Sequence, residues 1–256
     1  MQNLTVTLVQ AEQAWEDKAA NLRHYETLLK DVSDTELIVL PEMFHTSFTM
    51  NAAVHAEKLS DGEGINWLKQ MAQIKHCCIY TSLIIEENNA FFNMGIFVRP
   101  DGKMETYAKR KTFGLAREDQ YYAAGDKEQI VELNGWKLQL QICYDLRFPE
   151  MVRNRIVDEE PAYDAILYVA NWPEKRSTHW KSLLQARAIE NQCYVVGVNR
   201  VGKDGNGLIY SGDSGVYDPL GVYDPLTPHK EQVKTIHLDV NVLKNTRSAL
   251  PFLKDS

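Results

Sequence analysis

Apolar residues along the chain follow two spacings, and segments of the two kinds alternate. Spacing by two, or a short unbroken apolar run, predicts a strand. Such segments are Leu4–Gln10, Leu37–Leu40, Cys78–Ile85, Phe91–Val98, Met104–Tyr107, Trp136–Ile142, Ala165–Ala170, Tyr194–Asn199, Gly215–Tyr217 and Val233–Leu238. Spacing by three and four predicts helices at Asp17–Leu29, after the turn Asp61–Gly64, and at Thr178–Glu190. A further helix is expected to begin near Phe148.

The connections between these segments indicate the fold class. Strands joined both by helices and by hairpins, such as the one that turns at Glu86–Asn89, predict an α/β protein with a mixed sheet or two sheets and with helices outside. No repeat, low-complexity stretch or linker interrupts the pattern, so we expect one domain over residues 1–256. The glycine-rich segment Gly202–Gly207 lacks the spacing of a phosphate-binding loop and opens no helix, so we expect a surface turn there.

The composition narrows the classes of partner. A net charge of −7 and a pI near 5.5 disfavour nucleic acid and membrane surfaces as partners, because both attract basic proteins. No basic-then-apolar signal begins the chain, and no apolar run reaches the ~18 residues of a membrane span. The cysteine and histidine spacings predict neither a disulfide framework nor a metal site. We expect a cytoplasmic protein.

Cys143 ends a predicted strand and is a candidate nucleophile. The alternation of Trp136–Ile142 stops at this thiol, where the chain must turn sharply before the helix expected near Phe148. At a strand-to-helix elbow the sulfur is exposed, and free backbone N–H groups and a helix N-terminus lie close to it. These conditions favour a thiolate and stabilise an oxyanion. An inert core cysteine is the alternative for any single thiol.

Two further candidates also lie at strand ends. Glu42 follows the buried strand Leu37–Leu40, where desolvation would raise its pKa unless a cation pairs with it. Lys109 ends the strand that begins at Met104. Amide hydrolysis needs a nucleophile, a proton acceptor and a positive or N–H environment for the oxyanion, and a cysteine, a glutamate and a lysine can supply them. Taken singly, Glu42 could equally be a capping residue and Lys109 a solvated one.

Together and in this order, these segments resemble the nitrilase superfamily of carbon–nitrogen hydrolases. The resemblance extends over nearly the whole chain and is carried by Leu40–Phe44, Tyr107–Phe113, Ile142–Glu150 and Gln185–Gln192. In detail the chain looks closest to the omega-amidase branch, whose members hydrolyse the terminal amide of 2-oxoglutaramate and 2-oxosuccinamate. That closer match lies in Val169–Pro173, Ala188–Gln192 and Asn199–Gly202.

The resemblance implies a four-layer αββα sandwich, usually assembled as a homodimer or a larger oligomer, that needs no cofactor or metal. It also implies a catalytic set of Glu42, Lys109 and Cys143. In that mechanism Cys143 attacks the amide carbonyl while Glu42 takes the thiol proton, and Glu42 later activates water against the thioester. Lys109 and the backbone N–H of Tyr144 stabilise the oxyanion.

Periodicity alone leaves Lys109 and Lys111 both open, because residues two apart on a strand face the same side. The family pattern is Tyr-x-Lys with Phe four residues after the lysine, and Tyr107, Lys109 and Phe113 match it. Lys111 stands where relatives commonly have His, and Thr112 where Leu is usual.

Many relatives carry a second glutamate on the loop after the lysine. Glu118 fits that place, with Asp119 as its rival and a plain surface carboxylate as the alternative reading. Trp172 is expected either to wall the pocket or to cap the core. Arg176, on the loop after the strand that ends at Ala170, either binds a substrate carboxylate through its bidentate fork or is simply exposed.

Other polar and sulfur side chains are assigned structural roles. Asp145 and Arg147 are expected to pair and brace the elbow at Cys143. Arg187 and Glu190 lie three residues apart on a predicted helix and are expected to form an ion pair. The three remaining cysteines, which lie in apolar strand-like contexts, are expected to be inert: Cys77, Cys78 and Cys193.

The expected function is therefore that of an omega-amidase acting on a small-molecule amide. Three alternatives stay open: another amidase of the superfamily acting on deaminated glutathione or a carbamoyl amine, an acyl transferase in which an amine replaces water at the thioester, and a non-catalytic binding module. Substrate selectivity depends on loop geometry, which the sequence does not reveal.

Overall fold

The computed structural model describes residues 1–255 and contains two six-stranded sheets. The first has the order β16-β1-β2-β3-β4-β5, in which β1, β2 and β3 are parallel and the other neighbours pair antiparallel. Its strands are β1 (Leu4–Gln10), β2 (Leu37–Val39), β3 (Cys78–Glu87), β4 (Ala90–Val98), β5 (Met104–Ala108) and β16 (Gln232–Leu238).

The second sheet has the order β15-β14-β11-β10-β7-β6 and the same kind of mixed topology. Its three central strands are parallel, and its outer strands pair antiparallel with their neighbours. The strands are β6 (Ile130–Leu133), β7 (Trp136–Ile142), β10 (Ala165–Ala170), β11 (Tyr194–Asn199), β14 (Gly215–Tyr217) and β15 (Tyr223–Pro225). Two small hairpins stand apart: β8 (Ile156–Val157) with β9 (Glu160–Pro161), and β12 (Val201–Lys203) with β13 (Ile209–Ser211).

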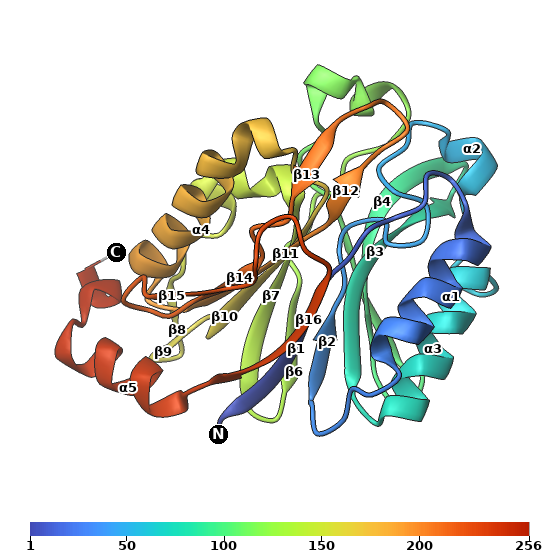
Figure 1. The fold of residues 1–256 in the computed structure, drawn as a ribbon. Coiled ribbons are helices and arrows are strands. Elements are labelled where there is room, and N and C mark those ends of the chain that lie inside the picture. The colour runs from blue at the N-terminus through green and yellow to red at the C-terminus, as the bar shows by residue number, and fades with distance from the viewer. Residues whose placement is uncertain (256) are drawn as a thin grey trace.

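Helices cover the outer faces of both sheets, so the molecule has four layers (Figure 1). Helices α1 (Lys18–Leu29) and α3 (Glu63–Lys75) pack on the first sheet, and α4 (Ser177–Asn191) packs on the second. The arrangement is the four-layer αββα sandwich that the resemblance implies. The remaining helical segments are short or terminal: α2 (Ala52–His55), α5 (Val240–Ala249), and the 3₁₀ segments η1 (Gly114–Ala116), η2 (Glu118–Gln120), η3 (Cys143–Arg147), η4 (Pro149–Met151), η5 (Glu174–Arg176) and η6 (Phe252–Asp255).

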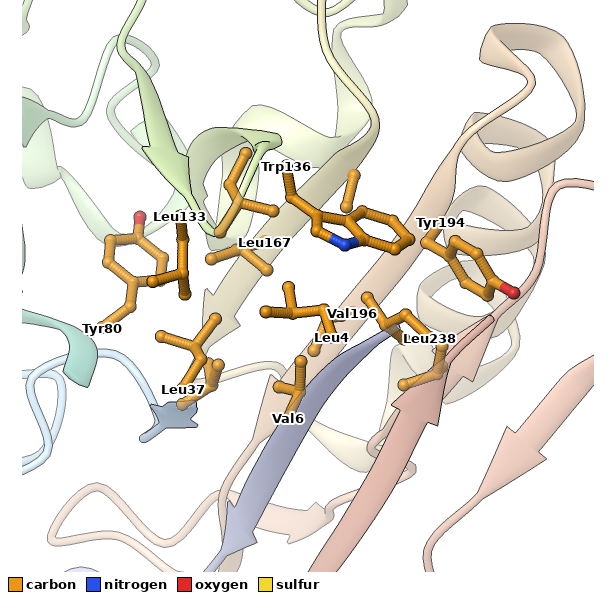
Figure 2. Close-up of a cluster of buried hydrophobic side chains, with 14 of the residues drawn as sticks. Leu4, Val6, Leu37, Tyr80, Leu133, Trp136, Leu167, Tyr194, Val196 and Leu238 are labelled. Atoms are coloured by element: carbon orange, nitrogen blue, oxygen red, sulfur yellow. The ribbon is translucent and has the colours of Figure 1, made fainter. Parts of the chain in front are cut away.

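Successive side chains of each strand point to opposite faces of its sheet, and this alternation divides the core into layers. Leu4 and Val6 of β1 face Leu167 and Val196 of the second sheet, and Trp136 closes the layer (Figure 2). The alternate residues of each strand face outward. Those of the first sheet pack against α1 and α3, and those of the second sheet pack against α4. Because both faces of the central strands are covered, these strands read as nearly continuous apolar runs.

The prediction of a helix that begins near Phe148 is wrong. Two 3₁₀ segments, η3 and η4, occupy this region instead. Pro149 disfavours the α conformation at the preceding residue, and Phe148 accordingly has φ −116° and ψ 84°. Strands β6 and β15, helices α2 and α5, and the two small hairpins were not predicted; apart from α5, these elements are all four residues long or shorter.

Candidate active site

Strand topology brings the three expected residues to one end of the sandwich. Glu42 follows β2, Lys109 follows β5 and Cys143 follows β7. The carboxyl ends of parallel strands meet at the same edge of a sheet. Since β5 pairs antiparallel with β4, and β4 with β3, β5 runs in the same direction as β2. The two sheets face each other, so this end of the first sheet meets the end of β7.

Glu42 is fully buried and is held by three donors. Its Oε1 accepts from Nδ2 of Asn93 at 2.7 Å and from Nζ of Lys109 at 3.1 Å. Its Oε2 accepts from the backbone N–H of Asn171 at 2.8 Å. The cation that the sequence argument required beside this carboxylate is therefore Lys109.

Lys109 lies between two buried carboxylates. Its Nζ is 2.9 Å and 3.0 Å from the two carboxylate oxygens of Glu118, whose side chain has no exposed surface. Burial opposes the charge of Lys109, but Glu118 and Glu42 outweigh it and raise the pKa above its ordinary value, which keeps the ammonium protonated. Asp119 is exposed, so the structure brings Glu118 and not its rival to the site. Lys111 instead places its ammonium 4.8 Å from the centre of the Phe148 ring.

Cys143 lies at a strained elbow. Its φ of 45° is a left-handed value that few residues other than glycine adopt, and such strain persists only where the surroundings hold it. Because η3 begins at Cys143, the N–H of Tyr144 lies in the first turn, where a helix offers it no acceptor. The Tyr144 ring packs between Phe113 and Phe148, at 5.0 and 5.3 Å between ring centres.

The expected pairing of Asp145 with Arg147 is wrong, although Asp145 does brace the elbow. Its carboxylate accepts from the backbone N–H of Ile142 at 3.1 Å, the backbone N–H of Lys111 at 2.9 Å and the hydroxyl of Tyr107 at 2.9 Å. Burial raises the pKa of Asp145 to about 6. Side chains two apart on a 3₁₀ segment point in different directions, so Arg147 faces away from Asp145 and lines the pocket.

At Cys143, burial opposes the conditions that favour a thiolate at the end of a strand. Burial raises the pKa of the Cys143 thiol well above its ordinary value, and the carboxylate of Glu42 adds to the rise, while Lys109 opposes it. The sulfur therefore keeps its proton until a base removes it. The sulfur lies 4.0 Å from the carbonyl oxygen of Asn171.

These groups line a pocket of about 490 Å³, a size that suits a small organic molecule. Aromatic and apolar side chains form most of the wall: Trp15, Phe48, Met50, Phe113, Tyr144, Trp172 and Tyr210. The tip of the β12–β13 hairpin also contributes, through Asp204, Asn206 and Leu208. The segment Gly202–Gly207, which we expected to be a surface turn, is thus exposed on one side and forms part of the pocket wall on the other. The hairpin that contains it stands at the upper end of the molecule in Figure 1.

Arg147 and Arg176 are the two arginines of the pocket, and both rest on aromatic rings. The guanidinium carbon of Arg147 lies 4.7 Å from the ring centre of Trp172, and that of Arg176 lies 5.4 Å from that of Phe113. Arg147 also donates to Nδ1 of His179 at 3.3 Å. Within residues 1–255 neither forms an ion pair with a carboxylate, so both keep donors free for an anion. Trp172 both walls the pocket and packs in the core, on the ring of Trp180.

Two site residues escaped the sequence argument, although each left a signal. Asn93 is a polar residue inside the otherwise apolar strand β4, and Asn171 directly follows β10 at the catalytic end. The amide group of Asn171 also donates to the carbonyl oxygen of Glu42, so this residue holds Glu42 through side chain and backbone.

The other residues given structural roles, which are Arg187, Glu190 and the three remaining cysteines, do not line the pocket. Arg187 and Glu190 form the expected ion pair, at 2.9 Å. The other three thiols are buried, and burial raises the pKa of Cys77 to about 12, that of Cys78 to about 11, and that of Cys193 as well. In the described part of the chain, no three His, Cys, Asp or Glu side chains are grouped to hold a metal ion. None of its helices is both long and apolar enough to span a membrane.

Comparison with known proteins agrees with this geometry. The carbon–nitrogen hydrolase family model matches residues 5–248. The chain is 41% identical to the omega-amidase YafV of Yersinia enterocolitica, over 100% of this chain and 98% of the relative. It is 29% identical to the 2-oxoglutaramate amidase of Bacillus subtilis, over 98% and 96%. A solved carbon–nitrogen hydrolase superfamily protein from Xanthomonas campestris superposes with a TM-score of 0.97, at 39% identity, covering 100% of this chain and 98% of that one.

Proposed function

Because the chain belongs to the carbon–nitrogen hydrolase family, we propose that it is an omega-amidase, which hydrolyses the terminal amide of 2-oxoglutaramate or 2-oxosuccinamate to the 2-oxo acid and ammonia. One observation carries the proposal. A protonated thiol at a strained elbow borders a buried carboxylate–lysine–carboxylate cluster, and the same pocket holds two arginines without carboxylate partners. The first feature suits attack on an amide, and the second suits a substrate with a carboxylate at its other end.

In the first half of the reaction, the sulfur of Cys143 attacks the amide carbon while its proton moves to Glu42. General-base activation is needed because the thiol is neutral at rest. The ammonium of Lys109 and the N–H of Tyr144 stabilise the negative oxygen of the tetrahedral intermediate. The carbon–nitrogen bond then breaks, and ammonia leaves with the proton from Glu42.

In the second half, Glu42 takes a proton from water, and the resulting hydroxide attacks the thioester carbon. The carbon–sulfur bond breaks, Glu42 returns its proton to the sulfur, and the acid formed releases its own proton to the solvent and leaves as a carboxylate. Glu118 acts as a supporting residue, because it shares Lys109 with Glu42 and keeps the lysine protonated near the thiol. No step of this scheme requires a cofactor.

The substrate end opposite the amide is held by arginine. Arg176 is the proposed anchor, with Trp172 forming the adjoining wall, and a bidentate charge-assisted contact contributes roughly 1.5–3 kcal/mol. Such a contact favours a substrate with a distal carboxylate over a neutral amide.

The setting of the enzyme is part of the proposal. All four cysteines are free, which suits the reducing cytoplasm. A homodimer is supported by exposed apolar side chains beside the outer face of α4: Ile189 at 51%, Leu220 at 54% and Val222 at 64% exposure. We propose that residues 1–256 form one domain.

Ammonia release from a panel of amides tests the function. The panel contains 2-oxoglutaramate, 2-oxosuccinamate, glutamine, deaminated glutathione and a carbamoyl amine, each measured with the parent enzyme and with Cys143→Ala. We expect the two 2-oxo acid amides to give the highest kcat/KM and the variant to be inactive. Faster turnover of deaminated glutathione or a carbamoyl amine would move the enzyme to another amidase branch.

A further inference from the structure

Arg200 is a buried cation that the proposed mechanism does not use. It follows β11 directly, its side chain has no exposed surface, and within residues 1–255 it forms no ion pair. A buried charge without a counter-ion is costly unless hydrogen bonds satisfy it. Burial accordingly lowers the pKa of Arg200 below its ordinary value, although a guanidinium stays protonated in proteins.

The guanidinium is satisfied by neutral oxygens from three separate segments. Its Nη1 donates to Oγ of Ser47 at 2.6 Å, in the turn that carries Glu42. Its Nη2 donates to the carbonyl oxygen of Gln13 at 3.1 Å and to that of Lys203 at 3.2 Å. One side chain therefore joins the loop after β1, the turn after β2 and the β12–β13 hairpin.

Each of these three segments also lines the pocket. Trp15 lies two residues beyond Gln13, Phe48 follows Ser47, and Tyr210 belongs to the hairpin. The ring of Tyr210 packs against the guanidinium of Arg200 at 4.7 Å, and the ring of Phe48 lies 5.2 Å from the ammonium of Lys109. Arg200 thus lies directly behind the pocket wall without being part of it.

The turn that carries Glu42 is strained and needs such an anchor. Met43 has a φ of 45° and Ser47 a φ of 65°, both in the left-handed region. The backbone N–H of Ser47 donates to the carbonyl oxygen of Met43 at 2.9 Å and closes the turn. Strained residues persist only where the surrounding structure holds them. Arg200 holds Ser47, and Ser47 holds the residue next to Glu42.

We propose that Arg200 is a positioning residue, which holds the Glu42 turn through Ser47 so that the carboxylate can take the proton of the Cys143 thiol. The inference rests on the proposed role of Glu42 as the base. It predicts that loss of the Arg200–Ser47 hydrogen bond slows the chemical step more than it weakens substrate binding.

The test compares Ser47→Ala, Arg200→Lys and the double variant, with 2-oxoglutaramate as substrate. Ser47→Ala should lower kcat by about tenfold or more and leave KM within about twofold, because a small misplacement of a catalytic group is costly. Arg200→Lys should lower kcat at least as much. The double variant should be no slower than Arg200→Lys, because two changes that break one contact are not additive.

A matched control is Arg247→Lys. Arg247 also donates to backbone carbonyls, those of Gln192 and Tyr163, but it lies on α5, away from the pocket. This variant should lower Tm and leave kcat unchanged. If Ser47→Ala and Arg200→Lys behave in the same way as Arg247→Lys, the inference is overturned. If Arg200→Lys does not fold, the kcat of Ser47→Ala decides alone.

The variant Glu42→Gln separates this inference from the proposed function. It should fold but be inactive, with a lower Tm, because the amide must turn its NH₂ group toward one of the donors that the carboxylate accepts. Activity in Glu42→Gln would overturn the role of Glu42 as base, and with it the positioning role. An inactive Glu42→Gln beside a fully active Ser47→Ala would overturn the positioning role only.

Discussion

The hydroxyl of Tyr107 donates to the carboxylate of Asp145 at 2.9 Å, and this buried bond connects the strand that leads to Lys109 with the turn that carries Cys143. The other two donors to Asp145 are backbone N–H groups, one from Ile142 before the thiol and one from Lys111 beyond the lysine. The nucleophile and the cation thus share one anchor, although neither contacts it through its own side chain.

Asp145→Asn should disturb this anchor while preserving its shape. The amide has only one acceptor oxygen, so its NH₂ group must face a backbone N–H that the carboxylate now accepts. A buried donor left without an acceptor costs about 1–3 kcal/mol of stability. We expect a lower Tm and a fall in kcat of about tenfold or more, because the elbow shifts. Thermal unfolding and steady-state kinetics measure both; Tyr107→Phe, which removes a single donor, should have the smaller effect. A fully active Asp145→Asn would show that the turn at Cys143 keeps its conformation without the Asp145 carboxylate.

Lys109 and Lys111 make different contacts, so we expect their substitution by alanine to lower turnover to different extents. Lys109→Ala removes the ammonium between Glu42 and Glu118 and should lower kcat roughly 10²-fold or more, as for loss of an oxyanion donor. Lys111→Ala removes only a contact with the Phe148 ring and should stay within about tenfold of the parent. Circular dichroism checks that both variants fold. The opposite ranking would reassign the oxyanion donor to Lys111.

Glu42→Gln should make the enzyme inactive yet make Cys143 easier to alkylate at neutral pH. The negative charge of Glu42 helps to raise the pKa of the thiol, whereas Lys109 opposes the rise. Removing that charge lowers the pKa and increases the thiolate fraction. In the parent enzyme the iodoacetamide rate should keep rising to alkaline pH, with its inflection above the ordinary cysteine value, and the curve for Glu42→Gln should move to lower pH.

Peptide mapping of the alkylated enzyme supplies the control for that experiment. Cys143 lines the pocket and is only half-buried, whereas Cys77, Cys78 and Cys193 are buried. Label on Cys143 alone, with loss of activity, is the expected result. Label on another thiol while activity remains would contradict the prediction that Cys143 is the only reactive thiol, and label on Cys143 with full activity would exclude it as the nucleophile.

The strand pattern predicted that Glu42, Lys109 and Cys143 stand just beyond strands, because such patterns are detectable without tertiary information. The proposed catalytic set itself came from the family resemblance, since the pattern left Lys109 and Lys111 both open. In the structure, the directions of those strands bring their ends together. The sequence could therefore predict that these side chains follow strands, which depends on local backbone structure alone.

What escaped prediction depends on contacts between distant segments. The bond from Asn171 to Glu42 joins residues 129 apart in the chain, and that from Arg200 to Ser47 joins residues 153 apart. The rise in the pKa of the Cys143 thiol escaped prediction for the same reason: desolvation and the charge of Glu42 come from the packed site, not from the residues next to the thiol in the sequence. For the helix expected near Phe148, the sequence did hold a contrary signal: Pro149 disfavours the α conformation at the residue before it.

The last prediction concerns the arginine that selects the substrate. Arg176→Ala should lower kcat/KM for 2-oxosuccinamate by at least about tenfold, which corresponds to about 1.4 kcal/mol, because a charge-assisted contact to the substrate carboxylate is lost. The loss should be absent for butyramide, a neutral amide without a carboxylate. Arg147→Ala, measured alongside, tests the other pocket arginine, and Arg153→Ala serves as a control, since Arg153 is exposed and contacts the carbonyl oxygen of Glu190. If Arg147→Ala shows the larger loss, the carboxylate lies over Trp172 and not near Phe113. If both variants keep the full preference for 2-oxosuccinamate over butyramide, neither arginine binds the carboxylate and selectivity arises elsewhere in the pocket.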